Sequence, residues 1–547
     1  ILFKAIGYIK VNAEDKKIQT TNGDIILWSD SDNSQSSGGN DTDEITLLAG
    51  TELNSSGGKI VLAGGADDGN NGGTASDGIP DNYAYRGAGD NIAGIELGPK
   101  GGIGNVVKIL SGGEDIIMRG RTGFSDAGPG LSSQGKLRID AGAGRIDIQG
   151  VSTVDHGVEF TYGAVPEVAI TSSYSGSGAA IRIAGGTTVA GYQGFWIYNN
   201  SNGNFLIQSA SATGGGVLLE GSSNNQQAVY LNSSSANVQI LSGSGDIIVR
   251  SNSIGSIIPT GSGQIYLNST MRFGTRLNAT DVQGITPSVT SSNANVSFIA
   301  SNINLGENYV TTFATTGSLS LLPRSADVSF SSAFTLQNIN IVGVTAFTLG
   351  KVTNTANITI NNTAQLPITG PISIYGGNLT LNAALTATND SIHLRATGTV
   401  TQTAALNANS LILNGTGTFT LTNTGNNIET LVGGAASGRL GALSFTDASG
   451  GLTIGTVMGR GGIYSTGSIL VETLTGDINI EKDISTTNTT PTAVTVIAGK
   501  NAALGSIAGG DIKLVGSPNI TMGTGGLVRL FSGYETNSTG LNALVGS

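Results

Sequence analysis

The chain has 547 residues with 84 Gly, 11 Pro and no Cys, and its formal net charge is −11. The lack of Cys excludes disulfide bridges and Cys-ligated metals, and the negative charge argues against a nucleic-acid partner. Charged residues make up 12% of the chain, about half of the roughly 25% usual in globular domains. No apolar run reaches the about 18 residues of a membrane-spanning helix, so we expect no membrane span.

From the amino terminus onward, short segments alternate apolar and polar residues between Gly-rich turns. This alternation predicts β-strands whose side chains point alternately inward and outward. In the first part of the chain the segments are Ile25–Trp28, Ile45–Leu48, Lys59–Ala63, Ile95–Leu97, Val106–Leu110, Asp115–Met118, Lys136–Ile139, Arg145–Ile148 and Ala180–Ile183. Each is too short to stand alone, so we expect it to stack on its neighbours.

Two stretches interrupt the pattern. An insertion at Ala66–Asn91 carries Asp67, Asp68, Asp77, Asp81, Tyr83, Tyr85 and Arg86. Insertions of this kind leave a solenoid on one face, which is often the binding face. We therefore expect these seven residues to form an exposed ligand-contact loop, with Tyr83 and Tyr85 contacting a glycan. A second stretch, Val151–Ala179, is expected to be irregular and holds Asp155, His156 and Glu159.

The alternating pattern continues to the carboxy terminus and is clearest in Gly370–Asn427. Near residue 285 the composition shifts towards Asn and Thr, which indicates two portions of one solenoid, 1–285 and 286–547. We expect Asn side chains to stack at matching turns of successive coils, because amide ladders stabilise stacked strands. The strand spacing would also suit a sandwich or a barrel. An all-β parallel β-helix is favoured because the same Gly-flanked phrase persists along the whole chain.

Several phrases resemble a known group of proteins. The segment Gly23–Asp32 (GDIILWSDSD) is similar to a phrase of filamentous-haemagglutinin-type adhesins, the giant secreted β-helical surface proteins of Gram-negative bacteria. Gly343–Ile360 and Gly370–Leu381 look like the repeats of very large surface proteins of Bacteroidetes and their relatives. The resemblance implies a right-handed parallel β-helix, a single elongated rod and an extracellular, cell-surface location. The chain starts at Ile1, so we expect it to be part of a longer precursor.

Few residues suggest chemistry. Glycoside cleavage uses two carboxylates about 5–10 Å apart, and Asp155, His156 and Glu159 are the best candidates, although solvated loop charges are the favoured interpretation. Glu96, Arg138, Asp147 and Arg182 are expected to form an outward ladder of surface ion pairs. Acidic loops at Asp30–Asp32, Asp41–Glu44 and Asp67–Asp81 offer oxygen ligands for Ca²⁺, but they lack the spacing of known calcium motifs. We therefore predict no catalytic residues, no cofactor and no resident metal, with Ca²⁺ as the alternative.

We expect a non-catalytic extracellular surface adhesin or stalk whose partner is a glycan or protein on a host or neighbouring cell. One alternative is a structural subunit that joins end to end or laterally into an extracellular fibre or sheath. A glycan-active β-helix enzyme is the less favoured alternative. Electron microscopy of the native material separates the first two, because a fibre subunit gives continuous filaments and an adhesin gives isolated rods.

Overall fold

The protein is built almost entirely of short parallel strands. The computed structural model describes residues 1–11, 15–33, 42–70, 73–87, 92–98, 105–123, 127–161, 167–189, 191–199, 204–211, 213–223, 227–233, 237–251, 264–268, 271–274, 294–305, 311–324, 327–361, 366–448, 450–503 and 510–541. Two compact units, Ile1–Ser320 and Leu321–Ser547, are described separately. The composition change predicted near residue 285 lies outside the described residues.

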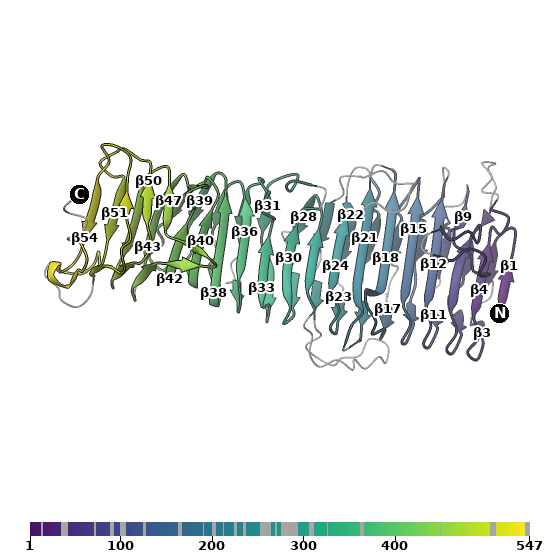
Figure 1. The fold of residues 1–547 in the computed structure, drawn as a ribbon. Helices are drawn as coiled ribbons and strands as arrows, with labels where there is room; N and C mark the ends of the chain where they lie inside the picture. Colours follow the sequence, from purple (N-terminus) through teal and green to yellow (C-terminus); the bar gives the residue numbers. More distant parts are fainter. Residues whose placement is uncertain are drawn as a thin grey trace. The chain divides into compact units, whose positions relative to one another are not determined.

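Each coil of unit 1 adds one strand to each of three parallel sheets (Figure 1). Sheet A contains β1 (Leu2–Lys4), β4 (Ile25–Ser29), β8 (Ile60–Gly64), β12 (Ile116–Thr122), β15 (Ile146–Ser152), β18 (Ala179–Thr187), β21 (Gly216–Ser223), β24 (Ile247–Ser251) and β27 (Val296–Ile299). Sheet B contains β2 (Ile9–Val11), β6 (Ile45–Leu47), β10 (Ile95–Leu97), β13 (Leu131–Ser133), β16 (Val158–Thr161), β19 (Phe195–Asn199), β22 (Gln227–Ser233), β25 (Gln264–Asn268) and β28 (Asn302–Leu305). Sheet C contains β3 (Lys17–Gln19), β7 (Glu52–Asn54), β11 (Val107–Leu110), β14 (Leu137–Asp140), β17 (Glu167–Ser172), β20 (Asn204–Ser209), β23 (Asn237–Ser242), β26 (Met271–Gly274) and β29 (Thr311–Ala314). The strand β30 (Ser318–Leu322) lies at the boundary between the units.

Unit 2 is also a stack of coils. Its sheet E contains β31 (Phe334–Leu336), β34 (Ile358–Ile360), β37 (Leu379–Leu381), β39 (Thr399–Gln402), β41 (Thr418–Leu421), β43 (Ala442–Asp447), β48 (Ile469–Thr473), β51 (Val494–Ile497) and β54 (Val528–Phe531). The remaining parallel strands are β32 (Ile339–Val342), β33 (Ala346–Leu349), β35 (Leu366–Ile368), β36 (Ile372–Gly376), β38 (Leu385–Ala396), β40 (Leu406–Asn414), β42 (Asn427–Gly433), β44 (Leu452–Ile454), β47 (Ile463–Ser465), β49 (Ile478–Ile480), β50 (Ile484–Thr486), β52 (Ile512–Leu514) and β53 (Ile520–Thr521). A small antiparallel hairpin joins β45 (Thr456–Val457) to β46 (Arg460–Gly461), and a 3₁₀ turn covers Glu535–Asn537.

The core of each unit is a set of aliphatic rows. In sheet A one such row is Ile25, Ile60, Ile116, Ile146, Ile181, Val217, Ile247 and Val296, in cross-strand register from coil to coil. None of these side chains is more than 1% exposed. Burying each one contributes about 1.5–3 kcal/mol before the entropy of ordering is subtracted. The register confirms the predicted parallel β-helix.

Polar side chains tie neighbouring coils together at the turns. The Asn357 Oδ1 atom accepts the Asn378 N–H at 3.0 Å, and Asn378 Oδ1 in turn accepts the Thr399 N–H at 2.7 Å. In unit 1, Asp24 Oδ1 accepts the Lys59 N–H at 2.8 Å. These bonds satisfy backbone donors that the sheets leave unpaired. Asn357 and Asn378 thus lie at matching turns, as predicted, but their bonds run from side chain to backbone and not from amide to amide.

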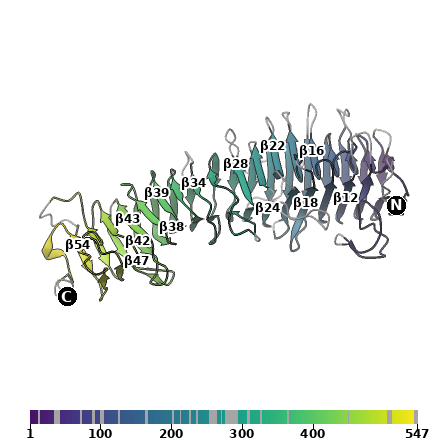
Figure 2. The same ribbon diagram turned by 90° about the horizontal axis from the view of Figure 1, so that it is seen from above.

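The corner between sheets A and B is closed by glycine. Figure 2 shows β12, β18 and β24 of sheet A next to β16, β22 and β28 of sheet B. At this corner the chain leaves the coils of β15 and β18 as side loops and returns beside its own starting strand. A Cβ built on Gly150 would overlap the Gly157 carbonyl, and one built on Gly185 would overlap the Gly194 carbonyl. Only glycine permits this backbone contact, which we call the neck of the side loop.

One sequence expectation about this region is wrong. Val151–Ala179 was expected to be irregular, yet it contains the regular strands β16 and β17, which stack in register on β13 and β14. Polar residues made β16 hard to recognise in the sequence. Glu159 and Thr161 take the outward positions of this strand, and they alternate with the inward Val158 and Phe160.

The neck predicts a sharp difference between two Gly→Ala substitutions. We expect Gly185→Ala to destabilise the protein by about 1–3 kcal/mol or more, because the new methyl group displaces backbone. Gly113→Ala is the matched control, since a Cβ there meets nothing within 4 Å. Urea unfolding should place the control within about 1 kcal/mol of the parent. Equal urea-unfolding midpoints for Gly185→Ala and Gly113→Ala would contradict the claim that the neck requires glycine.

Candidate functional site

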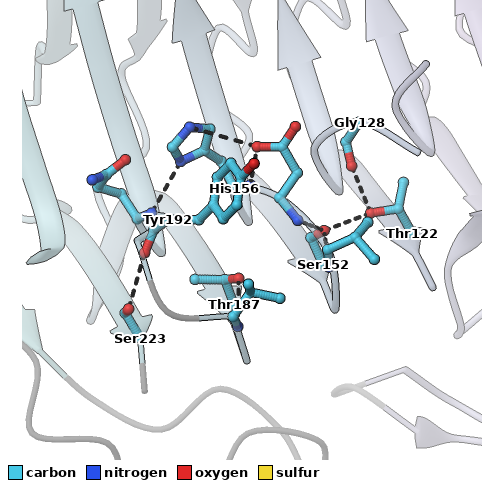
Figure 3. Close-up of polar contacts among 11 residues, drawn as sticks. Thr122, Gly128, Ser152, His156, Thr187, Tyr192 and Ser223 are labelled. Atoms are coloured by element: carbon cyan, nitrogen blue, oxygen red, sulfur yellow. Dashed lines mark hydrogen bonds and ion pairs between the residues drawn. The ribbon is translucent and has the colours of Figure 1, made fainter. Parts of the chain in front are cut away.

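The side loops of unit 1 start from a column of hydroxyl groups. Thr122, Ser152, Thr187 and Ser223 lie in register in sheet A. Figure 3 shows the hydroxyl groups beside the loops that they open. The Thr122 and Ser152 hydroxyl oxygens are 2.8 Å apart, and Ser152 Oγ accepts the Asp155 N–H at 2.8 Å. Ser223 Oγ donates to the Tyr192 carbonyl at 3.0 Å. The column therefore fixes where each loop begins.

The loop after β15 brings together the three residues singled out from the sequence. Asp155 and His156 lie in this loop, and Glu159 is on the outer side of β16. One ligand atom from each lies within 4.8 Å of the others. Glu159 and His156 are buried, and the Asp155 side chain is 16% exposed. The whole cluster comes from one coil, and the cross-strand neighbours of Glu159 on the adjacent coils are Ser132 and Trp196, neither of which is acidic.

His156 is held as a neutral side chain. The Gln193 backbone N–H donates to His156 Nδ1 at 3.0 Å (Figure 3). The neutral ring therefore carries its proton on Nε2, which faces Asp155 Oδ1 at 3.5 Å. Burial lowers the pKa of His156 to about 3. The ring centroid also lies 4.2 Å from that of Trp196 and 5.1 Å from that of Tyr192.

The two carboxyl groups of the cluster bind protons unusually well. Burial raises the pKa of Asp155 to about 6, against the His156 backbone N–H bond, which lowers it. Burial first, and then the charge of Asp155, raise the pKa of Glu159 to about 7. Neither shift has a contribution from Lys or Arg. At neutral pH the pair is therefore close to its titration range, so it can hold and release a proton.

This arrangement does not suit a metal that uses His156. A metal takes an unprotonated imidazole nitrogen, but Nδ1 already accepts a backbone N–H and Nε2 carries the proton. The chemistry that fits is proton exchange at two carboxyl groups whose pKa values are both raised towards neutrality, as in general acid–base catalysis. Sequence reasoning missed Tyr192 and Gln193 as partners. The matching phrases Gly157-Val-Glu-Phe and Gly194-Phe-Trp-Ile would have aligned the two coils.

The carboxylates of Asp67 and Asp81, in the insertion after β8, accept hydrogen bonds from backbone N–H groups of the same insertion. Asp67 carboxylate oxygens accept the N–H groups of Asp77 and Gly78 at 3.3 and 2.8 Å. Asp81 is buried and accepts the Gly69 N–H at 2.6 Å. Asp68 and Asp77 are exposed. These exposed carboxylates keep the ligand-contact prediction open.

The aromatic residues of the insertion are buried, although the sequence predicts that they are exposed. Tyr83 and Tyr85 are 5% and 4% exposed, so the prediction that they lie on the surface is wrong. The physical reason is β9 (Ala84–Arg86), which pairs with Gly120–Thr122 of β12, beyond the last residue that β8 covers. It also pairs with β5 (Thr42–Asp43). Arg86 is buried as well and forms an ion pair with Glu44 at 3.0 Å.

The acids proposed as calcium ligands are not gathered in space. Among the described residues, Asp155, His156 and Glu159 form the only group of three or more His, Cys, Asp or Glu side chains with ligand atoms this close. Asp41 lies outside the described residues. The calcium prediction thus receives no support from Asp30, Asp32 or the insertion.

The charged ladder exists and contains Asp147 and Arg182 as predicted, together with Glu220 and Arg250. Arg182 in β18 binds Asp147 of β15 at 3.0 Å and Glu220 of β21 at 2.7 Å, and Arg250 in β24 binds Glu220 at 2.5 Å. Glu96 and Arg138 lie in sheets B and C instead. Trp28 packs at a turn, with Nε1 donating to the Gly65 carbonyl at 2.8 Å.

Comparisons with known proteins return no match: no family model, no curated protein and no solved structure. Within the part of the chain that is described, no helix has the length and apolarity needed to cross a bilayer. The resemblance to filamentous-haemagglutinin-type adhesins stays a prediction.

The Asp155–Glu159 pair predicts a pH-dependent effect of Glu159→Gln. A raised pKa in the folded state means that the protonated carboxyl stabilises the fold below about pH 4.5, and that this contribution is lost as the pH rises to about 7. Gln mimics the protonated group, so the variant should stabilise β16 by about 1–3 kcal/mol at pH 8 and little at pH 4.5.

Hydrogen exchange of the β16 amides measures this local stability. Glu429→Gln, a change at an exposed carboxylate, is the control. The β16 amides of this variant should exchange at the same rate as those of the parent at both pH values. A Glu159→Gln effect of the same size at pH 4.5 and pH 8 would show that ionisation of the buried carboxyl is not its cause.

Proposed function

We propose that the protein is a non-catalytic extracellular surface adhesin or stalk that presents side loops along one edge of a β-solenoid. The observation that carries the proposal is the column of necks in unit 1. The chain leaves at Thr122, Ser152 and Thr187 and returns at Gly130, Gly157 and Gly194. Coils repeat about every 4.8 Å, so neighbouring loops can contact one ligand together. Insertions on one face are the common binding device of solenoids.

The loops along this edge differ in length and in the residues that they expose. The loop after β8 is long and carries the exposed Asp68 and Asp77. The loop before β19 instead exposes 37% of Tyr192. A fixed scaffold with variable loops suits recognition of a surface glycan or protein. The ladder of Asp147, Arg182 and Glu220 lies on sheet A, where it supports the scaffold.

Trimming the loop after β8 tests the proposal. The Asp81 N–H donates to the Ala66 carbonyl at 3.0 Å, so the two ends of segment 67–79 meet and a Gly-Ser turn can replace it. Tyr83, Tyr85 and Arg86 stay in place. We expect at least about a tenfold loss of binding on glycan arrays or to cells, because one of the presented contacts is removed.

Gly113→Ala, at the corner between sheets C and A, is the control and should bind like the parent. Parent-like binding by the trimmed protein would remove this loop from the contact surface. Failure of the parent protein to bind any glycan or cell would overturn the adhesin proposal.

A glycan-active enzyme is the second candidate, and the proton-binding pair Asp155 and Glu159 favours it. The Glu159→Gln variant tests it, because an enzyme that depends on this pair would release reducing ends from a polysaccharide and lose that release in the variant.

A further inference from the structure

A patch of polar and aromatic side chains lies on the outer side of unit 2. Tyr375 of β36, Arg395 of β38 and Asn414 of β40 occupy one cross-strand row. His393 of β38 lies in the neighbouring outward position. Arg460 comes from the hairpin β45–β46, which folds over this face. We call these five residues the Arg395 patch.

Hydrogen bonds and a ring contact join four of the five patch residues. Arg460 Nη1 donates to Asn414 Oδ1 at 2.8 Å. The Asn414 Nδ2 atom therefore faces His393 Nε2, 2.6 Å away, and donates to it. The His393 ring meets the Tyr375 ring edge to face at 5.4 Å. Burial, and then the charges of Arg460 and Arg395, lower the pKa of His393 to about 4, so this ring is neutral at pH 7.

The two arginines of the patch lack acidic partners. None of the ion pairs within 4.0 Å in the described residues includes Arg395 or Arg460. The Arg395 Nη1 atom is also buried without a hydrogen-bond partner. In unit 1, by contrast, Arg86, Arg182 and Arg250 each bind a carboxylate. The unpaired Nη1 therefore leaves a buried donor of Arg395 unsatisfied, which is costly, and an anion bound at this guanidinium group would offset that cost.

We propose that the Arg395 patch binds the carboxylate of an acidic saccharide. Guanidinium groups match carboxylates through paired, charge-assisted hydrogen bonds. The surroundings suit a sugar ring: Ser373 lies next to His393 across the strands, and the half-buried Tyr375 offers an apolar ring. The proposal rests on the adhesin function and names its ligand class.

Binding of oligogalacturonate to the full chain, measured by calorimetry, tests the patch. Neutral dextran, dextran sulfate and poly-glutamate are the comparison ligands. We expect oligogalacturonate to bind and the double variant Arg395→Gln/Arg460→Gln to bind at least about tenfold more weakly. Arg529→Gln removes the same charge from an exposed site on β54 and should change affinity by less than about twofold.

Four results would overturn the proposal. These are binding no tighter than that of neutral dextran, full affinity in the double variant, equal affinity for poly-glutamate, and tighter binding of dextran sulfate. Arg460→Gln alone, on the exposed hairpin, keeps the test valid if the double variant does not fold.

The patch and the adhesin function fail in different ways. Arginine-dependent binding of oligogalacturonate without attachment to cells would contradict the adhesin proposal and support the proposed Arg395 patch. If the parent and the double variant both attach to cells and the parent does not bind oligogalacturonate, the result would contradict the Arg395 patch and support the adhesin proposal.

Discussion

Backbone contact at the corner between sheets A and B is the constraint on which unit 1 depends. The inward rows of Ile, Leu and Val require every coil to return to the same register, because a slip of one residue turns each side chain to the opposite face. A side loop would break that register unless its two ends met. Gly150 with Gly157, and Gly185 with Gly194, let the ends meet by removing the Cβ atoms that would separate them. Loops can therefore vary while the stack continues.

The same geometry explains the electrostatics of the candidate site. Loops that fold back over sheet B bury Asp155 and Glu159 against His156 and Trp196, and neither pKa shift includes a basic contribution. On sheet A the outward acids stay beside arginines, so Asp147 and Glu220 are paired. Within one coil, the carboxyl groups at sheet B are thus buried without basic partners, whereas those on sheet A form ion pairs with arginines. The difference follows from what covers each sheet.

The strands and the fold class could be predicted from the sequence because they depend on local alternation. Ile146-Asp-Ile and Leu379-Thr-Leu each show one inward row and one outward residue. The burial of Tyr83 and Tyr85 could not be predicted in this way, because it depends on β9 pairing with Gly120–Thr122 more than thirty residues later. For the candidate site, Asp155, His156 and Glu159 were found from the sequence. Gln193 was not, because it reaches His156 only through the length of a whole coil.

Under the two proposals made above, each unit would contact a ligand in its own way on one kind of scaffold. Unit 1 offers loops of different length at fixed necks, and its arginines are used in ladders such as that of Arg182 and Glu220. Unit 2 has a hairpin that brings Arg460 over the strand face, beside Asn414. A solenoid distributes its stability between neighbouring coils, so one coil can carry a costly group without unfolding the others.

Hydrogen exchange of the parent protein tests the central claim most directly, because it compares the necks with the loops that they close. We expect the amides of β15 and β18 up to Gly150 and Gly185 to exchange slowly, and those of segments 153–156 and 191–193 to exchange at least about a hundredfold faster. Equal exchange of loops and necks would contradict the account, since the loops would then unfold together with the coils that present them.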